Sequence, residues 1–440
     1  MKKHILIIFL TLYSPLILFA DQQMFSLEDC IDYALKNSID INRSDNDVKI
    51  QNANLGKSKA ARLPNLQLGL NQQLSSVSNY DAINNEWDRN NNTTLNASLN
   101  SQVTLYNGSK LINSIRQSKT DLEAAELTVQ TYKESISLNI LSSYVTILLA
   151  KDNLVNSKLQ LEATQEQLAY SESRKKIGVI SLVELLKIKS QVATDKTTLI
   201  EAESNLRIAL VSLMQLMNMP VNEEFDIHKP DIDKIIEEKT ETDPDKVYKI
   251  ALELQPQIKE AALNIESFMT GIDIAKADAL PVLALNGGIN AGYSSSMDDV
   301  DFGEQFTNSI DPYVGLSLSI PIYQRNQVKT QVEIAKIQKN NSELDLSGIK
   351  NSLRKNIELV CTDAQTALTT YKAIQEQLNA EKESYNATNE MYMRGMLNSV
   401  DILISKNDLI IAENKFTQAK YNLILQNKIL EYYLGNSITL

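Results

Sequence analysis

Histidine and cysteine, the residues that most often carry catalysis or metal binding, are scarce in this chain. His4 and His228 are the two histidines, and Cys30 and Cys361 are the two cysteines, among 440 residues. His4 lies in the N-terminal segment, and the one remaining histidine cannot build a Ser-His-Asp triad or a histidine metal cluster. No Gly-rich phosphate loop is present either. The sequence therefore predicts a protein that is not an enzyme and holds no metal or cofactor.

The two cysteines could pair if the chain is exported to an oxidising compartment. Cys30 and Cys361 both fall in helical patterns, where a buried free thiol is the commoner state. A free thiol is the expected state at both positions, and a disulfide is the alternative.

Charged side chains are abundant and mostly acidic. The formal net charge is −12 and the pI is about 4.9. Phosphate binding needs clustered cations, so this balance argues against nucleic acid as a partner. With 13 Gly and 9 Pro, the chain also has little material for a loop-rich or all-β fold. Long helices are expected.

Cations and glycine meet at two places where helical patterns break. Arg174 precedes Gly178, and Arg394 precedes Gly395. Basic residues in a last helical turn, followed by glycine, are typical of a helix C-terminus. Both places are therefore predicted to be the tips of helical hairpins.

The residues after each tip resemble a capping box, with Ser181 and Glu184 in the first and Asn398 and Asp401 in the second. In this motif the first residue caps the helix, and the acidic residue three positions later bonds back to it. Capping is the default role expected of Glu184 and Asp401.

The first twenty residues have the features of a secretory signal peptide. Lys2 and Lys3 precede an apolar run at 5–19, which Ala20 closes before a polar segment. The alternative is a retained anchor, but the run is shorter than the ~20 residues of a spanning helix, and Pro15 interrupts it. We therefore expect cleavage near Ala20. No apolar stretch of spanning length follows, so a membrane contact of the mature chain would need β-strands.

The chain contains an internal repeat with a constant offset of 217 residues. Matching pairs include Ala34 with Ala251, Pro64 with Pro281, Tyr106 with Tyr323 and Gly178 with Gly395. Such a long period indicates a duplicated architecture rather than a solenoid of short repeats. We divide the chain into a signal peptide at 1–20, a first repeat at 21–218, an inter-repeat linker at 219–244 in an equatorial region, and a second repeat at 245–440.

Each repeat opens with a helical pattern, at about 26–62 and about 245–279, that stops at Leu-Pro. Proline disfavours the helical conformation of the residue before it, so Pro64 and Pro281 are predicted to switch the chain from helix to strand. The segments that follow alternate apolar and polar residues with period two. We expect strands at about 64–78 and 93–106 in the first repeat, and at about 281–295 and 311–323 in the second.

These strands are long enough for the ~9–11 residues that a tilted transmembrane strand requires. A pair of soluble hairpins packed on a core would show the same alternation. Four strands cannot close a membrane barrel, however, and lipid does not tolerate open sheet edges. If the strands span a membrane, several chains must share the barrel, and three chains would supply twelve strands.

Both repeats also contain a helical pattern far longer than a compact domain. From about 108 to 175 there is no proline, and apolar residues spaced by seven run from Ile115 to Ile136. A helix of ~68 residues would be about 100 Å long, so it must lie in a coiled coil. The returning helices carry heptads as well, from Leu185 to Leu213 and from Ile402 to Leu430.

The order of these features resembles the TolC-like outer-membrane efflux protein family over residues 24–435. The resemblance implies a mainly α fold with a small β part, in which a homotrimer forms a twelve-stranded β-barrel and a twelve-helix α-barrel tunnel. It implies the outer membrane of a Gram-negative bacterium, with the helices in the periplasm. The implied function is passive conduction in a tripartite efflux or type I secretion system. The implied partners are outer-membrane lipid, a periplasmic adaptor protein and an inner-membrane pump of the RND or ABC type.

The resemblance also implies roles for single residues. Glu184 matches the acidic tip residue of the first repeat, Tyr392 a tyrosine that helps to hold the entrance shut, and Asp401 an acidic residue that forms a ring there. Two positions depart from the family: Leu397 stands in place of an arginine of the closed state, and Ile404 in place of a second acidic ring. The residues expected to meet the adaptor are those of the tips, Arg174, Gly178, Arg394 and Gly395.

The heptads alone leave another hypothesis open, an elongated periplasmic coiled-coil scaffold that is soluble and has no channel activity. The strands and the export signal favour the channel. The sequence does not identify the cargo, because drug efflux, metal export and protein secretion all use such a duct.

Overall fold

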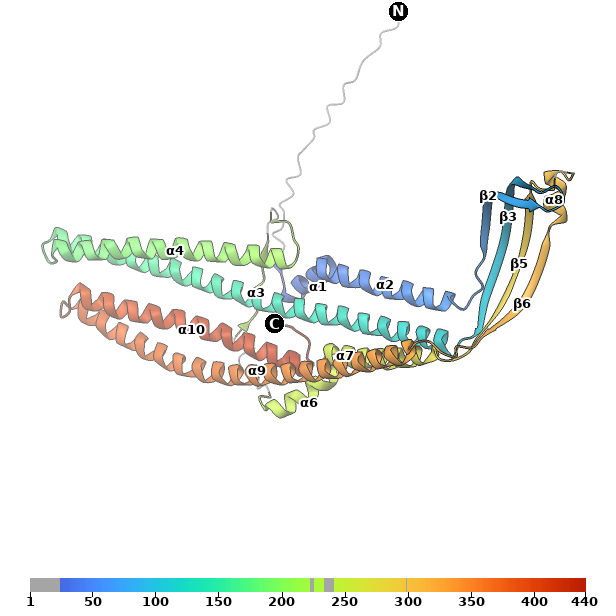
Figure 1. Ribbon diagram of the computed structural model, residues 1–440. Helices are drawn as coiled ribbons and strands as arrows, with labels where there is room; N and C mark the ends of the chain where they lie inside the picture. Colours follow the sequence, from blue (N-terminus) through green and yellow to red (C-terminus); the bar gives the residue numbers. More distant parts are fainter. Residues whose placement is uncertain (1–23, 222–224, 233–240, 298) are drawn as a thin grey trace, which may run out of the picture.

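The chain folds into an elongated body of helices with a narrow sheet projecting from one end, as a computed structural model shows (Figure 1). The structure describes residues 24–221, 225–232, 241–297 and 299–440. The predicted signal peptide at 1–20 lies outside the described residues. Within them, no helix combines the length and the apolar character needed to cross a membrane.

The helices repeat with the offset that the sequence predicts. The first repeat contains α1 (Leu27–Asn37), α2 (Ile39–Ala60), α3 (Lys110–Lys176) and α4 (Leu182–Leu216). The second contains α6 (Pro244–Leu254), α7 (Pro256–Ala277), α9 (Gln327–Met393) and α10 (Ser399–Tyr433). Each of these four helices of the second repeat starts 217 residues after its counterpart and has the same length. The two repeats therefore share one architecture.

The opening helix of each repeat is broken, although the sequence suggested one continuous segment. Ser38 has extended backbone angles, ends α1, and accepts a hydrogen bond from the Ile41 N–H at the start of α2. Gln255 occupies the equivalent position, and Pro256 after it has no N–H to continue the helix. A capping serine in one repeat and a proline in the other thus produce the same bend.

The two longest helices, α3 and α9, have 67 residues each and are about 100 Å long at 1.5 Å per residue. Antiparallel to them, α4 packs on α3 and α10 packs on α9, forming a first hairpin and a second hairpin. Figure 1 shows α4 along the half of α3 that lies away from the sheet, and α2 along the half near it. The helix α7 packs against both α3 and α9, so it joins the two repeats.

The sheet has four antiparallel strands in the order β2-β3-β5-β6. They are β2 (Gln67–Asp81), β3 (Glu86–Tyr106), β5 (Val282–Ser294) and β6 (Asp311–Ser319), with a short helix α8 (Phe302–Asn308) between the last two. A separate parallel pair, β1 (Met24–Phe25) and β4 (Asp226–Ile227), lies within the residues expected to be linker and start of the first repeat.

β2 is shifted by three residues from the expected 64–78, and two other strand ends differ by more. β3 starts at Glu86 and not near 93, because its polar, Asn-rich beginning pairs with the end of β2 across a tight turn. Side-chain alternation cannot reveal a stretch in which both faces are polar. β6 ends at Ser319 and not near 323, because Pro321 has no N–H to donate to a ladder.

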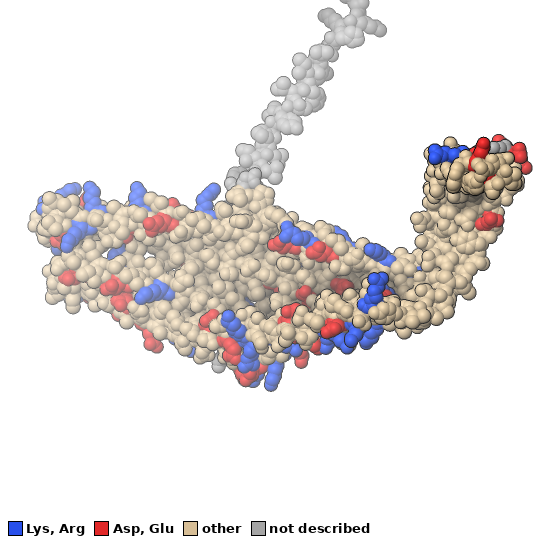
Figure 2. Space-filling model, viewed as in Figure 1, with Lys and Arg blue, Asp and Glu red and all other residues tan. Residues whose placement is uncertain are grey.

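One face of the sheet is apolar and the other is polar. Directly paired residues share a face, and the pairs Leu68–Leu99, Leu99–Ile289 and Leu285–Leu316 form one continuous apolar surface. Most of these side chains are exposed, Leu68 and Leu316 by two thirds. The charged residues of the strands lie near their loops, at 81, 86, 88, 89 and 311. Figure 2 accordingly shows few charges between the end of the sheet and the helical body.

The apolar core lies where the hairpins meet the short elements at mid-length. Leu27, Ile140, Leu213 and Tyr421 are buried there, from α1, α3, α4 and α10. Cys30 belongs to this cluster, whereas Cys361 belongs to a second one under α6. Both thiols are free and buried, so the disulfide alternative is wrong. Burial and nearby acidic residues raise the pKa of the Cys30 thiol to about 12, which keeps it protonated and unreactive.

Gly108 lies at the junction between β3 and the long helix α3. Gly108 has φ +64°, and a Cβ built on it would lie 2.6 Å from Leu280 Cδ1, next to the helix-to-strand switch at Pro281. We expect Gly108→Ala to lower the free energy of unfolding by ~1–3 kcal/mol, from left-handed strain plus overpacking. Thermal unfolding of the purified protein, followed by circular dichroism, measures this.

Gly56→Ala is the matched control, because Gly56 lies inside α2 with no atom near a built Cβ. It should raise the free energy of unfolding by ~0.5–1 kcal/mol. Equal shifts for the two variants would contradict a special role of Gly108.

Candidate functional site

The two hairpin tips lie at the end of the body opposite the sheet (Figure 1). Gly178 and Gly395 have φ +79° and +77°, the left-handed conformation expected after a helix C-terminus. In each tip a backbone bond spans the turn: the Val179 N–H donates to the Arg174 carbonyl, and the Met396 N–H to the Met391 carbonyl, both at 2.9 Å. No atom lies near a Cβ built on either glycine, so backbone conformation and not packing requires glycine here.

The second tip has a complete capping box, as its sequence predicts. The Asn398 side chain accepts hydrogen bonds from the Val400 and Asp401 N–H groups, and the Asp401 carboxylate accepts one from the Asn398 N–H at 3.3 Å. The carboxylate of Asp401 is therefore held at the start of α10, where the helix dipole favours a negative charge.

The first tip has half of this motif. Ser181 Oγ accepts a hydrogen bond from the Glu184 N–H at 3.1 Å, and among the described residues the Glu184 carboxylate accepts no reciprocal bond from the Ser181 N–H. The acidic groups of the two tips thus differ: the cap orients the carboxylate of Asp401 but not that of Glu184.

Arg174 and Tyr392, which belong to different repeats, meet between the two tips. The guanidinium carbon of Arg174 lies 5.6 Å from the ring centroid of Tyr392 and 5.6 Å from that of Tyr170. Tyr392 is 2% exposed, and its buried hydroxyl has no hydrogen-bond partner among the residues that the structure describes. Cation–π contacts of this kind contribute ~0.5–2 kcal/mol. The sequence alone did not bring these two residues together, because the contact depends on how the hairpins pack.

Apolar side chains surround the tips and are exposed. The first tip presents branched residues, among them Ile177 and Val183, which are 75% and 65% exposed. The second presents the flexible thioethers of Met391, Met393 and Met396. Arg394 is also exposed and pairs with Glu390 in a surface ion pair of 3.6 Å. Contiguous exposed apolar surface at one end of a molecule is typical of a protein-docking site.

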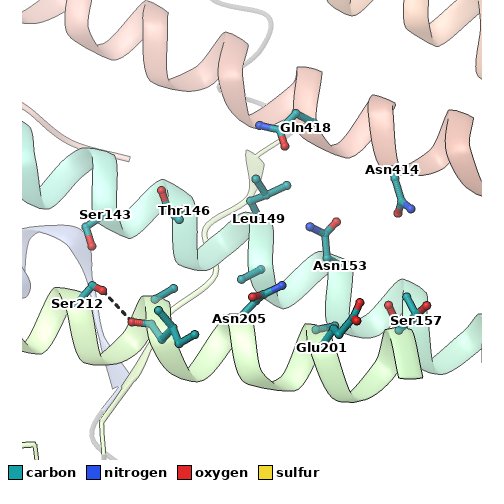
Figure 3. A pocket seen from close by; sticks show the side chains of 15 residues that line it. Ser143, Thr146, Leu149, Asn153, Ser157, Glu201, Asn205, Ser212, Asn414 and Gln418 are labelled. Carbon is teal, nitrogen blue, oxygen red and sulfur yellow. Dashed lines mark hydrogen bonds between the residues drawn. The ribbon is translucent and has the colours of Figure 1, made fainter. Parts of the chain in front are cut away.

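A groove with a volume of about 720 Å³ runs along the first hairpin, with one rim on α10. Figure 3 shows Ser143, Thr146 and Asn153 of α3 facing Asn205 and Ser212 of α4, with Gln418 of α10 nearby. Small polar side chains share the lining with Leu149, Ile208 and three alanines, and Asn153 Oδ1 is buried with no hydrogen-bond partner in the described part of the chain. Heptad spacing of apolar residues does not reveal such a mixed groove.

The described residues contain no group of three or more His, Cys, Asp or Glu side chains placed to hold a metal ion. What the tips offer is an oriented carboxylate, a buried aromatic contact and an apolar rim. These features can attract ions, hold two hairpins together and receive a partner, but they do not form or break bonds.

A family model described as outer membrane efflux protein matches residues 30–219 and 247–436, one match in each repeat. The chain belongs to this family. The resemblance noted from the sequence is thereby confirmed, with its mainly α fold, small β part and two tandem repeats. The protein is an outer-membrane efflux channel of a Gram-negative bacterium and is not an enzyme. The soluble-scaffold hypothesis is excluded.

Individual relatives are similar in sequence to this chain over most of its length. Outer membrane protein TolC of Escherichia coli K12 is 24% identical over 389 residues, which cover 86% of this chain and 76% of TolC. The pyoverdine export outer membrane protein OpmQ of Pseudomonas putida is 21% identical over 431 residues, covering 93% and 85%.

Solved structures share the fold at low sequence identity. The open state of the MtrE outer membrane channel of Neisseria gonorrhoeae has a TM-score of 0.77 at 17% identity, covering 95% of this chain and 91% of that one. The CmeC outer membrane channel of Campylobacter jejuni has a TM-score of 0.74 at 18% identity, covering 93% and 85%.

The capping box of the second tip generates a prediction. Asn398→Ala removes the side-chain oxygen that accepts hydrogen bonds from the Val400 and Asp401 N–H groups at the start of α10. This loss should destabilise the helix end by ~1 kcal/mol. Amide hydrogen exchange followed by mass spectrometry should show faster exchange at residues 399–403. The first tip, at 182–186, serves as the internal control, and faster exchange there as well would point to a global effect and contradict the assignment.

Proposed function

We propose that three copies of this chain assemble into one continuous duct, with a shared barrel of twelve strands in the outer membrane and a tunnel of twelve helices in the periplasm. The four-stranded sheet carries this proposal. Its outer strands, β2 and β6, each have one side without a strand partner in the described chain, while its apolar face is exposed. Open edges are not tolerated in lipid, so pairing between neighbouring copies is the arrangement that satisfies them.

The division of the chain follows from this proposal. Residues 1–20 serve as the export signal, 21–218 and 245–440 each provide two strands and one helical hairpin, and 219–244 link the repeats at mid-length. Pro64 and Pro281 mark the change from helix to strand, since α2 and α7 end a few residues before them. Each copy then contributes four strands and two hairpins to the wall.

We further propose that the tips form the periplasmic entrance. Asp401 faces the mouth, where threefold repetition concentrates negative potential and favours cations. Tyr392 and Arg174 hold the two hairpins of one copy together, and the exposed apolar rim with Arg394 and the turns at Gly178 and Gly395 receives a periplasmic adaptor. Glu184, whose carboxylate is not fixed by its cap, is available to that adaptor.

Opening would then be a population shift, in which the adaptor binds the open tips better than the closed ones. An inner-membrane pump of the RND or ABC type supplies the energy, and the duct conducts without chemistry and without a cofactor. Since Leu397 and Ile404 replace polar residues implied by the family resemblance, a single acidic ring at Asp401 is the constriction proposed here.

Assembly provides the direct test. Chemical cross-linking in native outer-membrane fragments should give a dominant trimer, which dissociates on heating in detergent, and the reconstituted protein should conduct ions across a planar bilayer. The trimer should persist in detergent before heating, because each interface joins strand edges and helix faces together. If cross-linking yields monomers alone, the shared barrel is wrong and the proposal is withdrawn.

The acidic mouth gives a second prediction. Asp401→Asn removes one charge per chain and should lower the cation-to-anion permeability ratio by about twofold or more, because the ring dominates the potential at the narrowest point. Reversal potentials in a salt gradient measure this ratio. Asp47→Asn is the control, since it removes the same charge from α2, far from the tips. An unchanged ratio in Asp401→Asn would exclude Asp401 from the mouth.

A further inference from the structure

A lysine is buried between the two hairpins, some way inside the tips. Lys406 lies on α10 and is 7% exposed. Its ammonium group donates a hydrogen bond of 2.6 Å to Thr164 Oγ1 on α3, a residue with no exposed surface. Lys406 is five residues beyond Asp401, so it lies about 7.5 Å further along the helix axis than the proposed ring. A long cationic side chain in such a place needs a compensating anion.

That anion is Asp195 on α4, which is 1% exposed. Its carboxylate accepts hydrogen bonds from the Gln160 and Gln191 side-chain amides at 2.7 and 2.8 Å and from the Thr164 hydroxyl at 2.5 Å. The Thr164 hydroxyl has one proton to donate. The short contact with the Asp195 carboxylate is the stronger hydrogen bond, because its acceptor is charged, whereas the Gln160 carbonyl at 2.9 Å is neutral. Thr164 thus donates to Asp195 and accepts from Lys406.

The resulting chain of groups is asymmetric. Asp195, Thr164, Gln160 and Gln191 all belong to the first hairpin, where they satisfy one another. Lys406 belongs to the second hairpin, and its hydrogen bond crosses to the first. Burial lowers the pKa of Lys406, and Asp195 opposes this effect. If the hairpins separate, the first keeps its network intact, whereas Lys406 loses its partner and must be hydrated.

The surrounding part of α3 carries small polar residues at buried positions. Ser157, Thr164 and Ser171 are buried at intervals of seven along α3, where a coiled coil would normally place large apolar residues. Among the described residues, the buried hydroxyls of Ser171 and Ser405 have no hydrogen-bond partner. Unpaired buried hydroxyls favour separation, because water would satisfy them. Lys406–Thr164 and Arg174–Tyr392 are contacts of the described chain that join the two hairpins toward the tips.

We propose that Lys406, Thr164 and Asp195 form a latch between the hairpins of one copy, and that this latch sets how readily the second hairpin swings away from the first to open the entrance. The inference rests on the proposed function, since it assumes a tunnel that opens at its tips. It assigns regulation to an internal contact, separate from both the charge ring and the adaptor surface. Release of the latch needs no chemistry, only hydration of the Lys406 ammonium.

The test compares two variants by single-channel recording. Lys406→Met keeps the length of the side chain and removes the cross-hairpin bond, so the open probability should rise about tenfold, as expected for the loss of a charge-assisted hydrogen bond. This variant also leaves Asp195 buried without its counter-charge. The double variant Lys406→Met with Asp195→Asn removes that second effect, because the amide at 195 can still bond to its glutamine neighbours.

The two variants separate a latch from a purely structural ion pair. For a latch, the double variant regains the thermal stability of the unmodified protein but stays about tenfold more open. If the double variant restores both stability and closure, the latch is overturned and charge balance alone is the role of Lys406. Unchanged open probability in both variants overturns it as well.

Controls keep this outcome distinct from failure of the proposed function. Lys415→Met removes an exposed lysine of the same helix and should leave gating unchanged. If the unmodified trimer itself gives no conductance, the channel proposal fails and the comparison has no reference state. If it conducts and closes normally while the latch variants match it, the latch alone is wrong.

Discussion

Backbone groups at the edge of a β-sheet must find partners, and this requirement determines the form of the molecule. A four-stranded sheet with an exposed apolar face cannot enter lipid alone, because β2 and β6 would each leave a row of N–H and C=O groups unpaired. The helices face a related problem, since a helix of about 100 Å cannot bury its apolar stripe within a single compact chain. In the proposed trimer, identical neighbours would complete both parts of the chain.

Within one chain, the hairpins are held together unevenly. At mid-length, Leu27, Ile140, Leu213 and Tyr421 form a tightly packed core that joins both repeats. Toward the tips, buried serine and threonine side chains and Lys406 lie among buried apolar residues such as Ile188 and Ile402. Dispersion and burial thus fix the hairpins at their bases, while polar contacts contribute at their ends. A structure built this way can bend at one end without losing its core.

Much of this architecture can be predicted from the sequence, because it depends on local rules. Leu-Pro disfavours helix and follows the ends of α2 and α7, a glycine after basic residues marks a helix end, and Asn398 with Asp401 caps the next helix as its pattern predicts. The constant offset between repeats then extends each local inference to a second place. The family resemblance rested on the order of these signals.

The remaining features depend on tertiary contacts or lack a pattern. The start of β3 was missed because both of its faces are polar there, and the contact of Arg174 with Tyr392 requires knowledge of how two repeats pack. Lys406 interrupts a heptad and would be assigned to the solvent side on composition alone. Its burial becomes apparent only with Thr164 and Asp195 beside it.

The identical helix lengths of the two repeats carry an evolutionary consequence. Since the four helices that correspond between the repeats have equal lengths and a constant offset of 217 residues, six half-length subunits could surround the same circumference as the three full-length chains of the proposed trimer. Fusion of two such halves lowers the symmetry of the ring from sixfold to threefold and frees alternate positions to diverge. The methionines and complete capping box of one tip, against the branched side chains and half-formed cap of the other, are the marks of that divergence.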